Sequence, residues 1–282
     1  MNAAAAERRR HVIDGCESAK RLAVFLRNRG KLAVALSGGS DSSVLLAFAA
    51  YCLGKERCLA LTVDAPYMVG KELESARRVC ERLGVRHVVC RTAIPELIRN
   101  NPPKRCYFCK RSVFSMLQQR ALDEGFEWLA DGTNVDDLGD FRPGMQAIKE
   151  LEVLSPFLEC GIGKDSIKAL GSMLDVPMEI VHAPAGACLL TRLEHGKKVM
   201  EEMLRRVEAA EDCLQVMGFL QCRVRVHGDA LARIELSPDD VRRAMEGSCR
   251  ERIVEAFRKL GFRHISLDMG GYERGSMNME GI

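Results

Sequence analysis

Residues 37–43 of this chain read Ser-Gly-Gly-Ser-Asp-Ser-Ser. The two glycines allow backbone amides to approach an anion, and the hydroxyls and the acid complete a polar site. The apolar run at 32–36 before them is typical of a buried parallel strand, and the run at 44–49 after them is typical of a helix. Since the N-terminus of a helix attracts negative charge, we expect a phosphate-binding loop.

Three cysteines form a second set of residues that could do chemistry. Cys106 and Cys109 share the first turn of an expected helix, where the helix N-terminus and neighbouring basic residues favour thiolates. By itself the pair fits a redox pair, half of a metal site or chance spacing. With Cys188, from a loop near an expected domain boundary, it would hold three irons of a 4Fe-4S cluster and leave the fourth open to sulfide. A zinc site would need a fourth ligand, such as His87 or His182.

The composition is that of an ordinary globular chain in a reducing compartment. Of 282 residues, 47% are hydrophobic, and no apolar stretch reaches the roughly 20 residues that cross a bilayer. The N-terminal stretch lacks the apolar run of a signal peptide, so the cytoplasm is expected. A net charge of +3 is too small for a general nucleic-acid surface, so neither nucleic acid nor a membrane is an expected partner. The other cysteines lack useful spacing and are expected to be packing residues: Cys16, Cys52, Cys58, Cys80, Cys90, Cys160, Cys213, Cys222 and Cys249.

Strand and helix patterns alternate through the first two thirds of the chain. Apolar strand patterns at 32–36, 58–64, 85–91 and 128–131 are separated by helical patterns, one of them at 71–83. This alternation predicts an α/β fold with a parallel sheet, which we assign to residues 1–195. Ligands bind beyond the carboxyl ends of such strands, so the loop at 132–144 is expected to face the same crevice as the loop at 37–43.

The pattern changes after residue 195. A one-sided helical stripe over 199–217 precedes two strand patterns, 222–226 and 230–236, joined by a hairpin turn. A helix opening at Ser237 and a strand at 263–268 complete a smaller α+β domain, 196–282. The hairpin alternates basic and apolar residues, and a solvated sheet edge is the favoured interpretation of its charges.

The loop with its strand and helix resembles the PP-loop of the ATP pyrophosphatase superfamily. The resemblance implies an adenine nucleotide alpha hydrolase-like fold and cleavage of ATP between the α and β phosphates. It further implies that Asp41 helps to hold Mg²⁺ and that Val63 and Asp64 border the adenosine. The residues expected to bind ATP are Ser37, Gly38, Gly39, Ser40, Asp41, Ser42, Ser43, Val63 and Asp64.

Further motifs make the chain similar to one family, LarE, over nearly its whole length. These are Arg-Cys-Tyr-Phe-Cys-Lys, Gly-Thr-Asn-Val-Asp-Asp-Leu-Gly-Asp-Phe-Arg-Pro-Gly, Ala-Cys-Leu-Leu-Thr-Arg, His-Gly-Asp-Ala-Leu-Ala-Arg-Ile-Glu and Gly-Ser-Met-Asn. The resemblance implies an ATP-dependent sulfur transferase that adenylylates the carboxylates of pyridinium-3,5-biscarboxylic acid mononucleotide and converts them to thiocarboxylates for the nickel-pincer nucleotide. It also implies a homo-oligomer.

Two versions of the sulfur step are known in that family. In one, a single cysteine at the position of Cys188 gives up its sulfur once and becomes dehydroalanine. In the other, three cysteines matching Cys106, Cys109 and Cys188 hold a 4Fe-4S cluster that carries sulfide from a donor, and this version is the expected one. Arg142 is expected to neutralise charge during adenylate transfer, and Arg192 to bind the phosphate of the mononucleotide, because guanidinium pairs bidentately with phosphate.

Three other functions remain open at this point. Thiolation of tRNA is also done by PP-loop proteins with three cysteines, but it needs a basic RNA surface. Amidation with ammonia leaves the cysteines unexplained. A nucleotide or cluster sensor without turnover is the alternative outside the enzymes.

Overall fold

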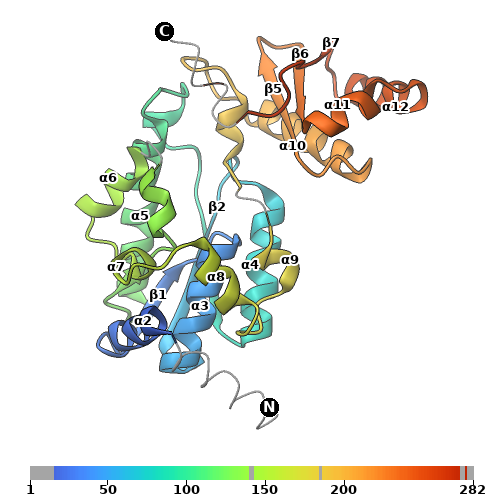
Figure 1. The fold of residues 1–282 in the computed structure, drawn as a ribbon. Coiled ribbons are helices and arrows are strands. Elements are labelled where there is room, and N and C mark those ends of the chain that lie inside the picture. The colour runs from blue at the N-terminus through green and yellow to red at the C-terminus, as the bar shows by residue number, and fades with distance from the viewer. Residues whose placement is uncertain (1–15, 140–142, 184–185, 274–276, 278–282) are drawn as a thin grey trace. The chain divides into compact units, whose positions relative to one another are not determined.

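The computed structural model describes residues 16–139, 143–183, 186–273 and Met277 (Figure 1). Their contacts divide the chain into two units. Unit 1 comprises residues 1–65, 70–92 and 106–186, and unit 2 comprises 66–69, 93–105 and 187–282. The sequence boundary at 195 differs from this division, because the residues after 186 and two short earlier segments pack with the C-terminal part. No helix of the described residues is long and apolar enough to span a bilayer.

Unit 1 is built on a parallel sheet of four strands. They are β1 (Leu32–Ala35), β2 (Cys58–Asp64), β3 (Arg86–Arg91) and β4 (Leu129–Ala130), in the order β3-β2-β1-β4. Every neighbouring pair is parallel. The predicted α/β class with a parallel sheet is therefore confirmed.

Helices flank this sheet along the chain. They are α2 (Glu17–Arg27), α3 (Ser40–Leu53), α4 (Gly70–Leu83), α5 (Arg105–Asp123), α6 (Pro143–Glu150), α7 (Pro156–Glu159), α8 (Lys164–Gly171) and α9 (Met178–Val181). The short 3-10 turns of unit 1 are η1 (Lys55–Arg57) and η3 (Val135–Gly139), whereas η2 (Glu96–Ile98) and η4 (Leu189–Arg192) belong to unit 2.

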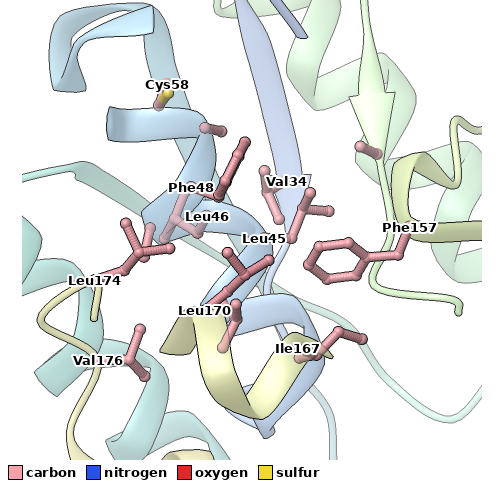
Figure 2. Packing of buried hydrophobic residues seen from close by; sticks show 14 of the residues in the cluster. Val34, Leu45, Leu46, Phe48, Cys58, Phe157, Ile167, Leu170, Leu174 and Val176 are labelled. Atoms are coloured by element: carbon pink, nitrogen blue, oxygen red, sulfur yellow. The ribbon is translucent and has the colours of Figure 1, made fainter. Parts of the chain in front are cut away.

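Two apolar layers cover the faces of the sheet because successive strand residues point to opposite sides. Leu32 and Val34 of β1 pack with α3 and α8 in one layer. Figure 2 shows Val34 in this layer together with Leu45 of α3 and Leu170 of α8. Ala33 belongs to the other layer, with Val113 and Leu117 of α5. Helix α3 is buried along residues 42–49, which explains why its sequence is apolar all round rather than one-sided. The buried helix fixes the loop before it.

Unit 2 contains a sheet of three strands, β5 (Cys222–His227), β6 (Leu231–Leu236) and β7 (His264–Leu267), in the order β5-β6-β7. The predicted hairpin is confirmed, since β5 and β6 are antiparallel, and β7 joins β6 in parallel. The helices of this unit are α10 (Glu201–Val216), α11 (Pro238–Met245) and α12 (Gly247–Lys259).

Candidate active site

The loop at 37–43 leaves the carboxyl end of β1 and turns directly into α3. Gly38 has φ +81°, a left-handed conformation that glycine adopts at little cost. A Cβ added there would overlap the backbone carbonyl oxygen of Glu72 in the first turn of α4. Gly38 is therefore required both by its backbone angle and by the close approach of α4.

The N-terminus of α3 is arranged as an anion site. Gly39 stands at the N-cap and so supplies no capping side chain, and the first turn of the helix carries no such hydrogen bond. The hydroxyl of Ser43 is buried and has no hydrogen-bond partner among the described residues. Donors at an uncapped helix N-terminus attract phosphate, so these residues fit the predicted nucleotide.

The other serines of the loop hold its shape. The amide of Ser37 donates to Oγ of Ser42 at 3.1 Å, and the two hydroxyls are 3.0 Å apart. Ser40 donates from Oγ to the carbonyl of Val181 at the end of α9, at 3.1 Å. The loop is thus fixed by its own side chains and by two neighbouring helices, α4 and α9.

Asp41 meets the loop that follows β4. Nδ2 of Asn134 donates to Oδ2 of Asp41 at 3.0 Å. A Cβ on Gly132 would lie 2.7 Å from the amide nitrogen of Ser42, so the two loops also touch through their backbones. Since β1 and β4 are neighbours, the two loops lie side by side, as the carboxyl ends of adjacent parallel strands require; that they face one crevice stays a prediction. A carboxylate oxygen beside a fixed amide is a suitable environment for Mg²⁺, which prefers oxygen ligands.

Asn134 was not singled out by the sequence, although its position four residues after β4, the strand beside β1, is a signal for it. It is fully buried and held from both sides. Its side-chain Oδ1 accepts a hydrogen bond from the backbone amide of Asp136, and its backbone amide donates to Oδ2 of Asp137. Asp136 also accepts from the amide of Lys164, at the start of α8. These two acids act inside the fold rather than as free charges.

The strand β2 ends beside the loop with the two residues expected near adenosine. Val63 and Asp64 are half-buried, and Asp64 pairs with Nε of Arg91 at 3.3 Å. One residue earlier, Thr62 donates to the carbonyl of Leu36, and Nε2 of His87 lies 2.8 Å from the Thr62 hydroxyl. Burial lowers the pKa of His87, and the charge of Arg77 adds to this effect. His87 therefore supports the end of β1 through the Thr62 hydroxyl. This contact engages its Nε2 within the fold, which does not favour His87 as a zinc ligand.

The cysteines fall into exposed and buried groups. Cys106 is exposed in the first turn of α5, whereas Cys109 is half-buried at the start of the second turn and not in the first turn that the sequence predicted. Cys188 is half-buried at the N-cap of η4. Within the described ranges, no three Cys, His, Asp or Glu side chains group into a metal site. Burial raises the pKa of Cys58 and of Cys80 to about 12, as expected for packing residues.

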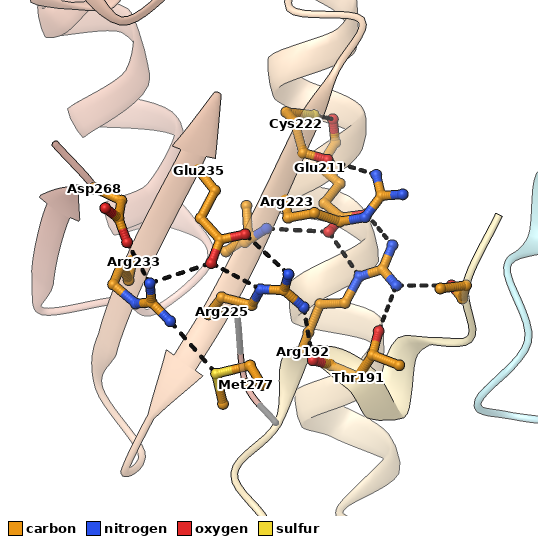
Figure 3. A network of polar contacts seen from close by, with 12 residues as sticks. Thr191, Arg192, Glu211, Cys222, Arg223, Arg225, Arg233, Glu235, Asp268 and Met277 are labelled. Carbon is orange, nitrogen blue, oxygen red and sulfur yellow. Dashed lines mark hydrogen bonds and ion pairs between the residues drawn. The ribbon is translucent and has the colours of Figure 1, made fainter. Parts of the chain in front are cut away.

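The loop after Cys188 is anchored by a buried ion pair in unit 2 (Figure 3). Arg192 is 2% exposed and pairs with Glu211 of α10 through Nε at 2.9 Å and Nη2 at 3.0 Å. Its Nη1 donates to the carbonyls of Ala187 and Cys188. Each guanidinium nitrogen of Arg192 thus already donates to a protein oxygen. These contacts do not favour binding of the mononucleotide phosphate by Arg192, which stays a prediction.

A second buried pair corrects the expected solvated edge. Arg225 of β5 is 4% exposed and Glu235 of β6 is 0% exposed, and they pair at 2.9 and 3.1 Å (Figure 3). Arg225 also donates to the carbonyl of Thr191, and Arg233 pairs with Glu235 and Asp268. The solvated interpretation is wrong for Arg225 and Glu235, because these opposite charges on adjacent strands are buried and neutralise each other beside Thr191.

Arg142, which was expected to act in adenylate transfer, lies outside the described residues.

Comparison with known proteins places these features in context. A family model described as asparagine synthase matches residues 21–116. The pyridinium-3,5-bisthiocarboxylic acid mononucleotide synthase of Lactiplantibacillus plantarum is 30% identical over 259 residues, covering 91% of this chain and 92% of that protein. An uncharacterized protein of Synechocystis sp. is 36% identical over 257 residues, covering 90% and 94%. The tRNA-5-methyluridine(54) 2-sulfurtransferase of Pyrococcus horikoshii is 30% identical over 121 residues, covering 39% and 37%.

Proposed function

Because the chain belongs to the LarE family of PP-loop sulfur transferases, we propose that it converts the carboxylates of pyridinium-3,5-biscarboxylic acid mononucleotide to thiocarboxylates. The observation that carries this proposal is the uncapped N-terminus of α3, tied through Asp41 to Asn134. It supplies what ATP-dependent activation of a carboxylate needs, which is a cradle for phosphates beside oxygen ligands for Mg²⁺.

In the first step a carboxylate oxygen of the substrate attacks the α phosphorus of ATP. An acyl adenylate forms and pyrophosphate leaves. Backbone amides at the start of α3 and the hydroxyl of Ser43 donate hydrogen bonds to phosphate oxygens, while the other serines of the loop hold its conformation. Mg²⁺ held by Asp41 would neutralise charge on the leaving pyrophosphate. Arg142 is proposed to meet the charge that develops at the α phosphate.

In the second step sulfur replaces the bridging oxygen. Hydroxide is a poor leaving group from a carboxylate, whereas AMP is a good one. A sulfur nucleophile attacks the acyl carbon, and the C–O bond to AMP breaks. Holding that nucleophile beside the adenylate gains from proximity, and a misplacement of about 1 Å costs about a hundredfold.

Two sources of the sulfur are compatible with the proposal. We favour a 4Fe-4S cluster on Cys106, Cys109 and Cys188, whose donor set is right and which would offer an open iron to sulfide. In the alternative, the thiolate of Cys188 attacks the acyl carbon and displaces AMP, which gives a thioester. A base, such as water, then takes the Cα proton of Cys188 and the Cβ–Sγ bond breaks, which leaves dehydroalanine on the protein and the sulfur on the product as a thiocarboxylate.

The proposal extends to partners and setting. It includes a sulfide donor, a homo-oligomeric enzyme and a cytoplasmic location, where the chain's twelve cysteines stay reduced. Neither nucleic acid nor a membrane is a proposed partner. The small net charge of +3 favours the mononucleotide over tRNA as substrate.

The experiment is anaerobic purification of the full chain, incubation with ATP, sulfide and the biscarboxylate mononucleotide, and mass spectrometry of small molecules and protein together. More than one thiocarboxylate per chain with Cys188 intact supports the cluster route, and Cys106→Ser should then abolish repeated turnover. Loss of one hydrogen sulfide from Cys188 at a single turnover supports the sacrificial route. Pyrophosphate release without any sulfur transfer rejects both.

A further inference from the structure

Asn101 is a buried polar residue in an unusual backbone conformation. It is 0% exposed and has φ +45°, in the left-handed region that asparagine tolerates better than most residues. Its Nδ2 donates to three backbone carbonyls, those of Leu190 at 3.2 Å and of Leu193 and Glu194 at 3.0 Å each. The reversed amide would set an oxygen against three oxygens, so the chemistry fixes this orientation. All three acceptors belong to the segment that follows Cys188.

Other contacts of unit 2 join the same two segments. The amide of Gly196 donates to the carbonyl of Asn101 at 3.2 Å, and that of Val199 donates to the carbonyl of Arg99 at 2.7 Å. Nη1 of Arg105, which is 4% exposed, lies 2.9 Å from Nε2 of His195. These bonds, with those of Asn101, tie residues 99–105 to residues 190–199. We call this set of contacts the Asn101 brace.

Within unit 2, the brace joins the residues that precede Cys106 in the sequence to those that follow Cys188. Arg105 is the residue before Cys106 and begins helix α5. At the other end, the Asn101 side chain holds the carbonyl of Leu190, two residues after Cys188, and the amide of Leu189 donates to the carbonyl of Tyr67. The buried Arg192–Glu211 pair fixes the loop from α10. The Asn101 brace fixes it from the segment that leads into the cysteine pair.

We propose that Asn101 is a positioning residue for sulfur transfer, which holds the Cys188 loop to the segment leading into Cys106. The inference rests on the proposed function in one respect, namely that sulfur leaves from Cys188 or from a group that it holds. A residue needed only for folding would raise the free energy of unfolding without changing the rate at which the Cys188 thiol reacts. The two roles therefore differ in what they change.

The variant that tests the brace is Asn101→Gly in the full chain. Glycine keeps the left-handed backbone at no cost and removes only the amide side chain. Glu152→Gly is the matched control, because Glu152 also has a positive φ, +54°, and is exposed. Should Asn101→Gly fail to fold, His195→Ala weakens the brace at Arg105, and His195→Gln restores an acceptor there.

Three measurements separate positioning from stability: hydrogen exchange of residues 187–199, the alkylation rate of Cys188 by mass spectrometry, and sulfur transfer beside pyrophosphate release. In Asn101→Gly we expect exchange and alkylation to rise at least tenfold, with alkylation of Cys249 unchanged as an internal reference. Sulfur transfer should fall at least tenfold while pyrophosphate release stays within twofold. Glu152→Gly should match the wild type throughout.

Unchanged exchange and alkylation in Asn101→Gly overturn the brace. A loosened loop with full sulfur transfer overturns its positioning role. If the wild type transfers no sulfur, the proposed function fails, and the alkylation rate of Cys188 alone then decides whether Asn101 positions this thiol.

Discussion

Gly38 provides the sharpest test of the phosphate loop, through the substitution Gly38→Ala. Its φ of +81° costs an L-residue about 1–2 kcal/mol. The added Cβ would also lie 2.8 Å from the carbonyl carbon of Glu72 and 3.1 Å from the amide nitrogen of Ala76. Both neighbours are backbone of α4, so the overlap adds about 1–3 kcal/mol. We expect a loss of about 2–5 kcal/mol in the free energy of unfolding.

Gly30→Ala is the matched control for this prediction. Gly30 has φ +72° and nothing within 4 Å of an added Cβ, so it shares the backbone strain without the overlap. We expect it to lose only about 1–2 kcal/mol and to keep its pyrophosphate release within about twofold. In Gly38→Ala the loop must shift away from α4, which should lower substrate-dependent pyrophosphate release about a hundredfold. Urea unfolding and a pyrophosphate assay measure both effects. Equal behaviour of the two variants would refute the close approach of Gly38 to α4 as the reason for glycine.

Three further outcomes follow from other parts of the structure. Asn134→Ala removes a hydrogen bond to the Asp41 carboxylate worth about 1.5–3 kcal/mol, so pyrophosphate release should fall about tenfold or more; an unchanged rate would separate Asn134 from the site. Glu211→Gln leaves the charge of Arg192 buried without a carboxylate and should cost about 3–5 kcal/mol in urea unfolding, an expectation that a loss below about 1 kcal/mol contradicts. Because burial lowers the pKa of His87, the folded state favours the neutral imidazole. The stability of the fold with neutral His87 is present in full above about pH 6.5, and it is lost as pH falls through the folded-state pKa, because the unfolded chain then binds the proton more readily. His87→Gln keeps an amide donor and should flatten this acid limb of the thermal-unfolding profile; an identical slope would show that another group is responsible.

The sequence predicted the parallel sheet and the phosphate loop because both depend on local patterns. An apolar strand followed by two glycines and an apolar helix indicates a strand, a tight turn and a helix from local residues alone. Its boundaries are close: the strand expected at 58–64 is β2, Cys58–Asp64. The meeting of the loops after β1 and β4 was also within reach, because strand ends in a parallel sheet share one edge.

The buried charges could not be predicted, because their partners are distant in sequence. Arg192 is 19 residues from Glu211, and Arg225 is 10 residues from Glu235 on the neighbouring strand. A single sequence shows alternating charges there and cannot tell a solvated face from a neutralised one. Asn101 was missed for the same reason, since its acceptors lie 89–93 residues later.

The most direct test of the account follows the oxygen that sulfur replaces. The biscarboxylate mononucleotide, labelled with ¹⁸O in its carboxylates, is incubated with ATP, Mg²⁺ and a sulfide source, and AMP and the product are analysed by mass spectrometry. Attack of the carboxylate on the α phosphorus and loss of AMP to sulfur predict one ¹⁸O in AMP for each sulfur gained by the product. Thiocarboxylate formed with unlabelled AMP, or labelled AMP formed without sulfur in the product, would contradict the account.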